Sequence, residues 1–475
     1  MRSTILAALC FGLLLISPGV SMGADDHYLQ SIETFVHSRF DKKTDCMVIG
    51  LVDEHGSTTI SAGSLDNGTD QHANGDSVFF IGSVSKTFTT LLFQDMVDRG
   101  ELSLNDPVEK YLPKSVTIPT HGGKEITLLD LATHTAGFPI NPDNMTGKDF
   151  KEQYETYTVE KMYAFLSAYT LRRDPGTEFE YSNVGMALLG HVLELKAGTD
   201  FESLMVARIC RPLHMDSTCI NPTPQLKTRL AMGHDKTGNP SPPWNLQVYA
   251  PVGAVHSTAN DLLKYVSAQA GLAPSVLAAA MEKTHVIRHT DSRGLVEIPG
   301  FGTFGQTAMD WTDRGAFQPP SMQLLGHAGG AGSYHAWVGF DMKQHRGVVV
   351  LSTANDLSVE AIGWTLLQQK PLTPTSTKDF EREIVGIGVA LDLDKQTKSL
   401  VITKVFANSP AAQAGLSPGL IIQKIGDIPL DGKTLADSIK LLRGSAGTKV
   451  QLVLIDPAGK TNSVEITRQK FLIVQ

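Results

Sequence analysis

The sequence is poor in cysteine and in long apolar stretches. Only four of its 475 residues are cysteine, and 7% are aromatic. Four cysteines are too few for a disulfide-stapled scaffold, and no paired-cysteine or His-Glu-x-x-His metal signature occurs. Long basic runs are also missing and the formal net charge is -8, which argues against binding of nucleic acid. We therefore expect no metal, no other cofactor and no nucleic-acid partner. The length and ordinary composition favour two or three globular domains.

The clearest apolar stretch lies at the N-terminus. Residues 5–16 are apolar and follow Arg2, and a Pro-Gly pair and small residues come after them, at 18–24. This order is typical of a secretory signal peptide. The run is shorter than the roughly 20 apolar residues that span a bilayer, although an N-terminal anchor is the alternative. We predict a signal peptide over residues 1–23 and a periplasmic or secreted mature protein without a membrane span.

Three cysteines remain in the predicted mature chain. Cys210 and Cys219 are close enough in sequence to bridge a short loop in an oxidising compartment. Cys46 opens an apolar, strand-like run, where a buried free thiol is the usual case. None of the three has the setting of a metal ligand or a nucleophile.

Hydrophobic periodicity divides the rest of the chain into two regions joined by a linker. The first region opens with a helix and two strands, continues with mostly helical patterns, and ends with three strands and a helix. These elements are expected at residues 28–40, 47–52, 58–62, 83–100, 184–195, 322–325, 334–340, 347–351 and 359–367. Residues 371–380 are rich in Pro and Thr and are typical of a linker. Short strands and two short helices follow over 381–475.

Ser83 and Lys86 form the only Ser-x-x-Lys in the chain, at the start of a predicted helix. Residues three apart share one helix face, so the lysine amine is expected beside the serine hydroxyl. The helix N-terminus also offers unpaired backbone donors and a positive dipole end, which suit developing negative charge. Taken alone this motif is weak, because a solvated helix start has the same pattern.

Two further motifs follow in the chain. Tyr181 and Asn183 form the only Tyr-x-Asn, just before an apolar helix. The tyrosine hydroxyl is a candidate for moving the serine proton, and Asn183 for holding substrate. His327 and Gly329, followed by Gly330, form a His-x-Gly at the end of a predicted strand. Small residues there let a substrate lie along the strand, and the Gly330 N–H is expected to complete an oxyanion hole with that of Ser83.

In this order the three motifs resemble the class C β-lactamase and low-molecular-weight penicillin-binding protein superfamily, over about residues 30–370. Further segments carry the same resemblance: Leu129 to Pro139 (LDLATHTAGFP), Arg211 to Met215 (RPLHM) and Ser257 to Leu262 (STANDL). The resemblance implies an α+β fold, in which an antiparallel sheet flanked by helices meets a helical lobe.

The resemblance also implies a role for each motif residue. Ser83 would be the acylated nucleophile, Lys86 and Tyr181 its general-base system, and Asn183, His327, Gly329 and Gly330 the substrate-binding residues. Class C β-lactamases have Lys-Thr-Gly on the strand where this chain has His327-Ala328-Gly329. The charge of a histidine depends on pH, so it anchors a carboxylate less firmly than lysine. The Lys-Thr-Gly at 236–238 is flanked by Asp235, Asn239 and Pro240 and is expected to be a turn.

The C-terminal region, residues 381–475, resembles a bacterial PDZ domain. Its Gly386, Ile387, Gly388 and Val389 would form the loop that offers backbone N–H groups to a peptide carboxylate, with the peptide added as an extra strand. An alternative is that this module binds nothing and packs on the catalytic domain. The predicted organisation is therefore a signal peptide (1–23), a serine hydrolase domain (24–370), a linker (371–380) and a PDZ-like domain (381–475).

The predicted function is an exported serine hydrolase that works through a covalent acyl-enzyme. The expected substrates are D-Ala-D-Ala-type cell-wall peptides or small esters and amides. Hydrolysis of β-lactams is the alternative within the same chemistry. An alternative of another class is a catalytically weak penicillin-binding adaptor that recruits a peptide C-terminus through the PDZ module.

Overall fold

The computed structural model describes residues 26–473, apart from 42, 236, 289–295, 299–301, 305, 308, 310, 314–320, 356, 373–381, 394–398, 407–408, 432, 434, 443 and 457–458. The predicted signal peptide and most of the predicted linker lie outside these residues. Contacts divide the chain into two compact units, residues 1–374 and 375–475. Within the described residues, no helix has both the length and the apolar character needed to cross a membrane.

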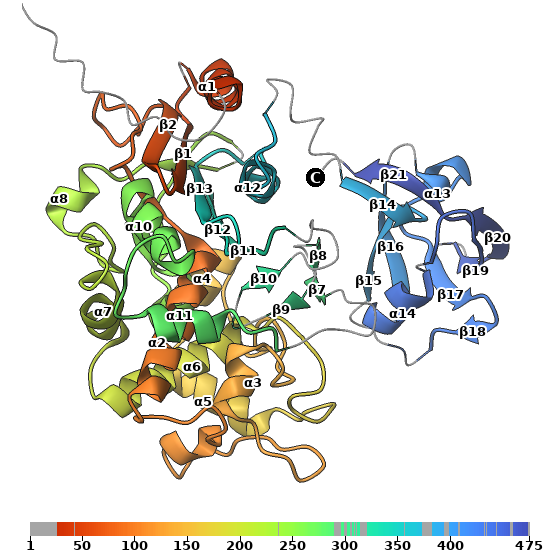
Figure 1. Ribbon diagram of the computed structural model, residues 1–475. Coiled ribbons are helices and arrows are strands. Elements are labelled where there is room, and N and C mark those ends of the chain that lie inside the picture. The colour runs from red at the N-terminus through yellow and green to blue at the C-terminus, as the bar shows by residue number, and fades with distance from the viewer. Residues whose placement is uncertain are drawn as a thin grey trace, which may run out of the picture. The chain divides into compact units, whose positions relative to one another are not determined.

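An antiparallel sheet forms the first unit's framework (Figure 1). The strand β1 is buried along almost its whole length, and its partner β2, at the edge of the sheet, is partly exposed. Although β1 lies near the start of the chain, it pairs with β13, placing Met47 opposite Ser352. Within the described residues the strand order is β2 (Gly56–Gly63), β1 (Cys46–Asp53), β13 (Arg346–Ser352), β12 (Tyr334–Asp341), β11 (Leu324–Ala331), β10 (Thr312–Asp313) and β9 (Gln306–Thr307).

Helices cover both faces of this sheet. The helices α1 (Asp26–Phe40) and α12 (Val359–Leu367) pack against one face, and α10 (Ala259–Gln269) packs against the other (Figure 1). Glycines let the layers approach closely. A Cβ at Gly363 of α12 would lie 2.1 Å from the Trp337 ring, and one at Gly50 of β1 would lie 3.0 Å from Leu263 of α10.

The remaining helices form a lobe around α2, which is buried along nearly its whole length. Small strand pairs lie outside the main sheet: β3 (Val78–Phe80) with β6 (His256–Thr258), β4 (Gly233–His234) with β5 (Pro240–Ser241), and β7 (Val296–Ile298) with β8 (Gly302–Phe304). The helical elements are η1 (Gly82–Val84), α2 (Ser85–Asp98), η2 (Val108–Tyr111), α3 (Leu128–Ala132), α4 (Phe150–Glu155), α5 (Val159–Ala168), α6 (Asn183–Ala197), α7 (Phe201–Met205), η3 (Val206–Cys210), α8 (Pro224–Lys227), η4 (Gln247–Tyr249), α9 (Ala250–Gly253) and α11 (Ala278–Thr284).

The second unit is a small β structure with its own apolar core. Its main sheet runs β15 (Val389–Leu393), β16 (Leu400–Val405), β17 (Ile421–Ile425), β19 (Lys449–Ile455), β20 (Thr461–Thr467), with β18 (Ile428–Pro429) on β17. A separate pair joins β14 (Arg382–Gly386) to β21 (Gln469–Ile473). The helices are α13 (Pro410–Gln413) and α14 (Leu435–Leu442), and α14 packs against β15 and β17.

The expected α+β class is thus observed, and the largest difference in strand length from the prediction is at β11. The pattern predicted a strand ending at Leu325, whereas β11 continues to Ala331. The extension consists of three glycines, two alanines and His327, which carry little apolar signal, and it is held by pairing with β12. The predicted helix at 359–367 has the observed bounds of α12.

Candidate active site

Ser83 lies on a tight turn between β3 and α2. The backbone enters this turn through Ile81, whose N–H donates to Val255 O at 2.9 Å. Gly82 follows with φ 51°, a left-handed conformation that favours glycine. Ser83 stands in the single 3₁₀ turn η1, which continues directly into α2. Its side chain is partly exposed while its neighbours are buried, so the hydroxyl stands at the edge of the helical lobe.

Lys86 places its amine on the Ser83 hydroxyl. The Lys86 side chain is fully buried, and its Nζ donates to Ser83 Oγ at 2.7 Å and to Val252 O at 3.3 Å. The same Nζ lies 4.8 Å from the centre of the Tyr181 ring. The structure therefore brings together Ser83, Lys86 and Tyr181, which are separated by up to 98 residues of sequence.

Tyr181 is held just before helix α6. The ring is buried, with 5% of its surface exposed. The next residue, Ser182, is the N-cap of α6, and its Oγ accepts from Gly185 N at 3.0 Å. Serine at this position satisfies an otherwise unpaired N–H of the first turn. The helix start thus fixes the backbone on which Tyr181 stands.

Asn183 belongs to a polar triangle that the sequence did not reveal. Its Nδ2 donates to Tyr154 OH at 3.1 Å and to Asn141 Oδ1 at 3.3 Å, and Tyr154 OH donates to Asn141 Oδ1 at 2.8 Å. Among the described residues the buried Oδ1 of Asn183 has no hydrogen-bond partner. The amide is therefore held by its two donors, while its buried acceptor has no partner among the described residues. Tyr154 lies on the short helix α4, whose sequence has no apolar periodicity.

The strand β11 packs directly against the turn that carries Ser83. A Cβ at Gly329 would lie 2.1 Å from Ile81 O and 3.0 Å from Ser83 N. A Cβ at Gly82 would lie 2.8 Å from Gly330 N. Both positions therefore require glycine for the two segments to meet. His327 is buried and, two residues before Gly329, lies on the same face of the strand.

The short strand β10 pairs with only the first part of β11 on the side away from β12, and this pairing ends at Gly326, opposite Thr312. Within the described residues no strand pairs with the stretch from Ala328 to Ala331 on that side. An extended substrate can add to such an edge through main-chain hydrogen bonds.

An aromatic pair stands beside these groups. The rings of Tyr154 and Trp244 are stacked with centres 6.1 Å apart. A Cβ at Gly332, in the β11–β12 turn, would lie 3.1 Å from Trp244 Nε1. The pair therefore links the asparagine triangle to the end of β11. Nothing in the local sequence around Trp244 indicated this position.

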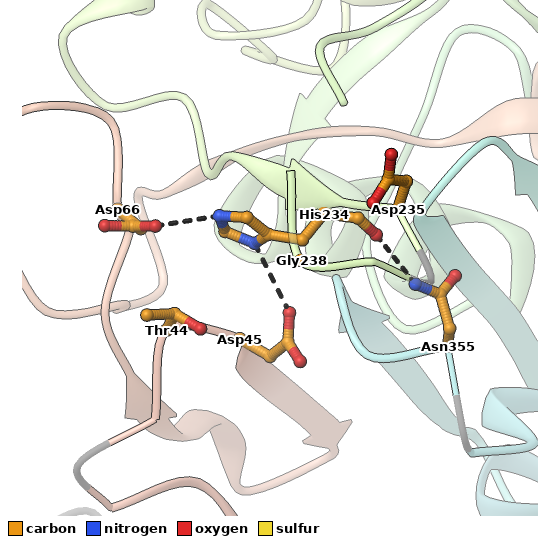
Figure 2. A pocket seen from close by; sticks show the side chains of 7 residues that line it. All are labelled: Thr44, Asp45, Asp66, His234, Asp235, Gly238 and Asn355. Atoms are coloured by element: carbon orange, nitrogen blue, oxygen red, sulfur yellow. Dashed lines mark hydrogen bonds and ion pairs between the residues drawn. The ribbon is translucent and has the colours of Figure 1, made fainter. Parts of the chain in front are cut away.

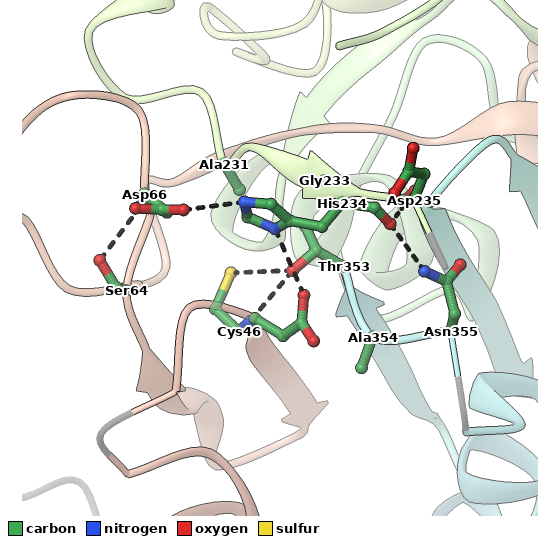
Figure 3. A network of polar contacts seen from close by, with 12 residues as sticks. Cys46, Ser64, Asp66, Ala231, Gly233, His234, Asp235, Thr353, Ala354 and Asn355 are labelled. Carbon is green, nitrogen blue, oxygen red and sulfur yellow. Dashed lines mark hydrogen bonds and ion pairs between the residues drawn. The ribbon is translucent and has the colours of Figure 1, made fainter. Parts of the chain in front are cut away.

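A second polar region surrounds His234 and is a structural junction. It lines a pocket of about 400 Å³ (Figure 2). His234 Nε2 lies 2.8 Å from Asp66 Oδ2, and its carbonyl accepts from Asn355 Nδ2 at 2.8 Å. Figure 3 shows these contacts joining three separate segments of the chain. Ser333, in the β11–β12 turn, donates to the same carbonyl, so the junction supports the turn that follows β11.

The Lys-Thr-Gly segment is the predicted turn. Asp235 Oδ1 accepts from the backbone N–H groups of Thr237 and Asn239 at 2.8 and 3.0 Å. The Thr237 hydroxyl and these N–H groups lower the pKa of the Asp235 carboxyl to about 2. Lys236 lies outside the described residues. In the part of the chain described, no cluster of three or more His, Cys, Asp or Glu side chains is arranged to hold a metal ion.

The three described cysteines are free thiols. Cys46 and Cys210 are buried and Cys219 is partly buried. Burial raises the pKa of each thiol to about 12. The predicted buried thiol at Cys46 is confirmed, whereas the structure shows no bridge between Cys210 and Cys219.

In the second unit, the predicted carboxylate loop joins β14 to β15. Gly388 has φ 83°, and its carbonyl accepts from Phe406 N at 3.0 Å and from Ser409 Oγ at 3.2 Å. Ile387 is buried, and its carbonyl accepts from Ala411 N at 2.7 Å. The loop is thus anchored by its carbonyls. Val389 begins β15, which forms one edge of its sheet.

Comparison with known proteins decides the family. A family model described as β-lactamase matches residues 34–370, well over half of the chain. The chain belongs to the β-lactamase family. This membership confirms the predicted class of enzyme, a β-lactamase-related serine hydrolase. A PDZ-domain model matches residues 401–456, so the second unit contains a PDZ domain, as predicted.

Relatives of this β-lactamase-family protein include both peptidases and β-lactamases. The D-alanyl-D-alanine-carboxypeptidase/endopeptidase AmpH of Escherichia coli K12 is 30% identical over 220 residues, which are 46% of this chain and 56% of AmpH. A β-lactamase of Pseudomonas fluorescens is 28% identical over 359 residues, which are 67% of this chain and 94% of that protein. The chain therefore spans little more than half the length of AmpH.

Solved structures confirm the predicted fold. A β-lactamase/D-alanine carboxypeptidase from Yersinia pestis has a TM-score of 0.61 at 22% identity, covering 73% of this chain and 96% of its own. The D-alanine carboxypeptidase AmpC from Burkholderia cenocepacia has a TM-score of 0.57 at 26% identity, covering 72% and 99%. The β-lactamase/transpeptidase-like architecture expected for the first unit is the one these proteins have.

Proposed function

We propose that the protein is an exported serine hydrolase that acylates Ser83 with D-Ala-D-Ala-type peptides or small esters and amides. The observation that carries the proposal is the 2.7 Å hydrogen bond from the buried Lys86 Nζ to Ser83 Oγ, beside the Tyr181 ring. Covalent catalysis requires a nucleophile in contact with a basic group, and a third group that orients the base.

The chemistry proceeds in two halves. Ser83 Oγ attacks the substrate carbonyl, and its proton passes to the Lys86–Tyr181 pair. The tetrahedral oxygen is stabilised by the N–H groups of Ser83 and Gly330. The leaving amine or alcohol departs with the proton, leaving an ester on Ser83. Water then attacks this ester, with the same pair taking and returning the proton, so that the acid product and free Ser83 are restored.

The neighbouring groups define how the substrate binds. The stretch of β11 from Ala328 to Ala331 is the proposed place of the substrate backbone, and Asn183 is the proposed contact for its amide. His327, on the face of the strand that meets the nucleophile turn, is the anchor for a terminal carboxylate. Histidine in place of lysine favours the peptidase or esterase activity over β-lactam hydrolysis. The second candidate, a β-lactamase, is favoured by the name of the Pseudomonas fluorescens relative.

Intact-mass spectrometry of the mature protein mixed with a penicillin tests the proposal. A lasting adduct on wild type that is absent from Ser83→Ala indicates slow deacylation and a peptidase-like enzyme. Rapid loss of the penicillin without a lasting adduct, again dependent on Ser83, indicates a β-lactamase. The matched control is Ser103→Ala, because Ser103 is exposed and lies outside the site. If neither penicillin nor p-nitrophenyl acetate reacts in a Ser83-dependent way, the hydrolase proposal is refuted and the adaptor alternative remains.

For the PDZ domain we propose capture of a peptide C-terminus. The edge strand β15 faces no further strand in the described residues, and α14 packs beside it. A peptide can add to β15 with its carboxylate at the N–H groups of Gly386 to Val389. Fluorescence polarisation of labelled C-terminal peptides with a free or an amidated terminus tests this, because only the free carboxylate should bind.

We also propose the domain boundaries and location given by the sequence pattern. These are a signal peptide over 1–23, a hydrolase domain over 24–370, a linker over 371–380 and a PDZ domain over 381–475, in a periplasmic or secreted protein. Mass spectrometry of the protein recovered from the exporting host tests the first boundary. A mature N-terminus at Ala24 supports it, and an uncleaved chain contradicts it.

A further inference from the structure

His134 holds the backbone on both sides of Tyr181. Its carbonyl accepts from Glu180 N at 2.7 Å, and its ring Nδ1 accepts from Ser182 N at 3.1 Å. The residues immediately before and after Tyr181 are therefore tied to one residue, 47 positions earlier in the chain.

Two conformational features make this clamp possible. His134 has φ 57°, a left-handed conformation that is uncommon for a residue with a side chain. This conformation lets its carbonyl and its ring reach the same segment. Because Nδ1 accepts a backbone hydrogen bond, the ring must be the neutral imidazole with its proton on Nε2.

The His134 ring also contacts the Tyr181 ring. The two centres are 4.6 Å apart with planes inclined by 38°, and Phe179 meets His134 edge-on at 5.6 Å. Only 3% of His134 is exposed. Tyr181 thus has a fixed ring beside it as well as a fixed backbone, in the position where its own ring lies 4.8 Å from Lys86 Nζ.

We propose that His134 is a positioning residue for Tyr181: it fixes the tyrosine beside the Ser83–Lys86 pair through the Ser182 hydrogen bond and the ring contact. The inference rests on the proposed function, because it assigns His134 a role in acylating Ser83. His134 affects acylation only through the position of Tyr181. A misplacement of a catalytic group by about 1 Å costs on the order of 100-fold in rate.

A double-mutant cycle tests this in the full-length protein, using the acylation rate constant of Ser83 with p-nitrophenyl acetate or penicillin, whichever reacts with wild type. His134→Phe keeps a ring but removes the acceptor, and should slow acylation about 30- to 100-fold with little change in substrate affinity. In a Tyr181→Phe background the same substitution should cost less than about threefold, because the residue it positions no longer has a hydroxyl. Equal losses in both backgrounds, or no loss in either, overturn the proposal.

His134→Asn provides the matched variant and a test that does not depend on the folding of His134→Phe. The asparagine Oδ1 occupies the place of Nδ1 and can accept from Ser182 N, and asparagine tolerates a positive φ. It should retain acylation within about tenfold of wild type, whereas His134→Ala should lose much more. Asparagine as impaired as alanine overturns the proposal. Failure of wild type to acylate Ser83 at all refutes the proposed function instead, so the two failures are distinguishable.

Discussion

Replacing Gly329 by alanine should push β11 away from the turn that carries Ser83. The added Cβ would lie 2.1 Å from Ile81 O, 2.9 Å from Val84 N and 3.0 Å from Ser83 N, all backbone atoms. An ordinary contact to a Cβ is about 3.4 Å or longer, so β11 must move away from the Ser83 turn by roughly 1 Å. Such a displacement should reduce kcat/KM for the acylating substrate by about 100-fold.

Gly330→Ala is the comparison, because its Cβ would meet nothing closer than His335 Nδ1 at 3.8 Å. This variant should lose less than about tenfold. Both variants are assayed for Ser83 acylation by intact-mass kinetics, with thermal unfolding to show that each is folded. A folded Gly329→Ala with wild-type kcat/KM would refute the reasoning, because β11 would then not determine the geometry at Ser83.

Three further predictions concern binding, pH and the second unit. Tyr154→Phe removes the hydroxyl that orients Asn183 and should raise KM about fivefold. Tyr163→Phe, which removes a hydroxyl that contacts His191 instead, should leave KM unchanged. Steady-state kinetics of the two variants tests this, and equal KM values would contradict it. Burial lowers the pKa of His256 to about 4 and that of His285 to about 3. Because the unfolded chain then binds more protons than the folded protein below pH 6.5, the free energy of unfolding should fall by about 3 kcal/mol per histidine between pH 7 and 4. Denaturant unfolding curves that are equal at the two pH values would contradict this. Arg468 donates to Leu441 O, Leu442 O, Thr448 Oγ1 and Lys449 O. Arg468→Met removes these hydrogen bonds and should therefore destabilise the PDZ domain by about 3 kcal/mol, which a lower unfolding midpoint would show. The rate of Ser83 acylation should stay at the wild-type value.

The sequence predicted those parts of the site whose residues are close in the chain or lie in periodic elements. Ser83 and Lys86 share a helix face, and their contact follows from their spacing. Tyr181 and Asn183 precede a strongly apolar helix, so their placement at its start was predictable. The bounds of α12 followed from apolar periodicity alone.

The residues that the sequence did not reveal act through contacts between distant loops. Tyr154 reaches Asn183 across 29 positions from a short polar helix, and Trp244 lies in a proline-rich segment without periodicity. His134 was visible as part of a family-like segment, but its proposed role depends on a left-handed φ and on contacts with residues 180–182 that the sequence pattern does not indicate. The end of β11 was missed because glycine and alanine have low strand propensity, while the pairing with β12 supplies the stability.

The contact between Gly329 and the Ser83 turn sets the point in synthesis at which the proposed active site can be complete. Ser83 is among the first hundred residues to be made, but β1 pairs with β13, and β11 is made about 250 residues after Ser83. A nascent chain therefore carries Ser83 and Lys86 through about half of its synthesis before β11 can join them. On the proposed function, covalent labelling of Ser83 by a penicillin or an ester would report that the sheet has closed, and it could be used to follow the folding of this protein in time.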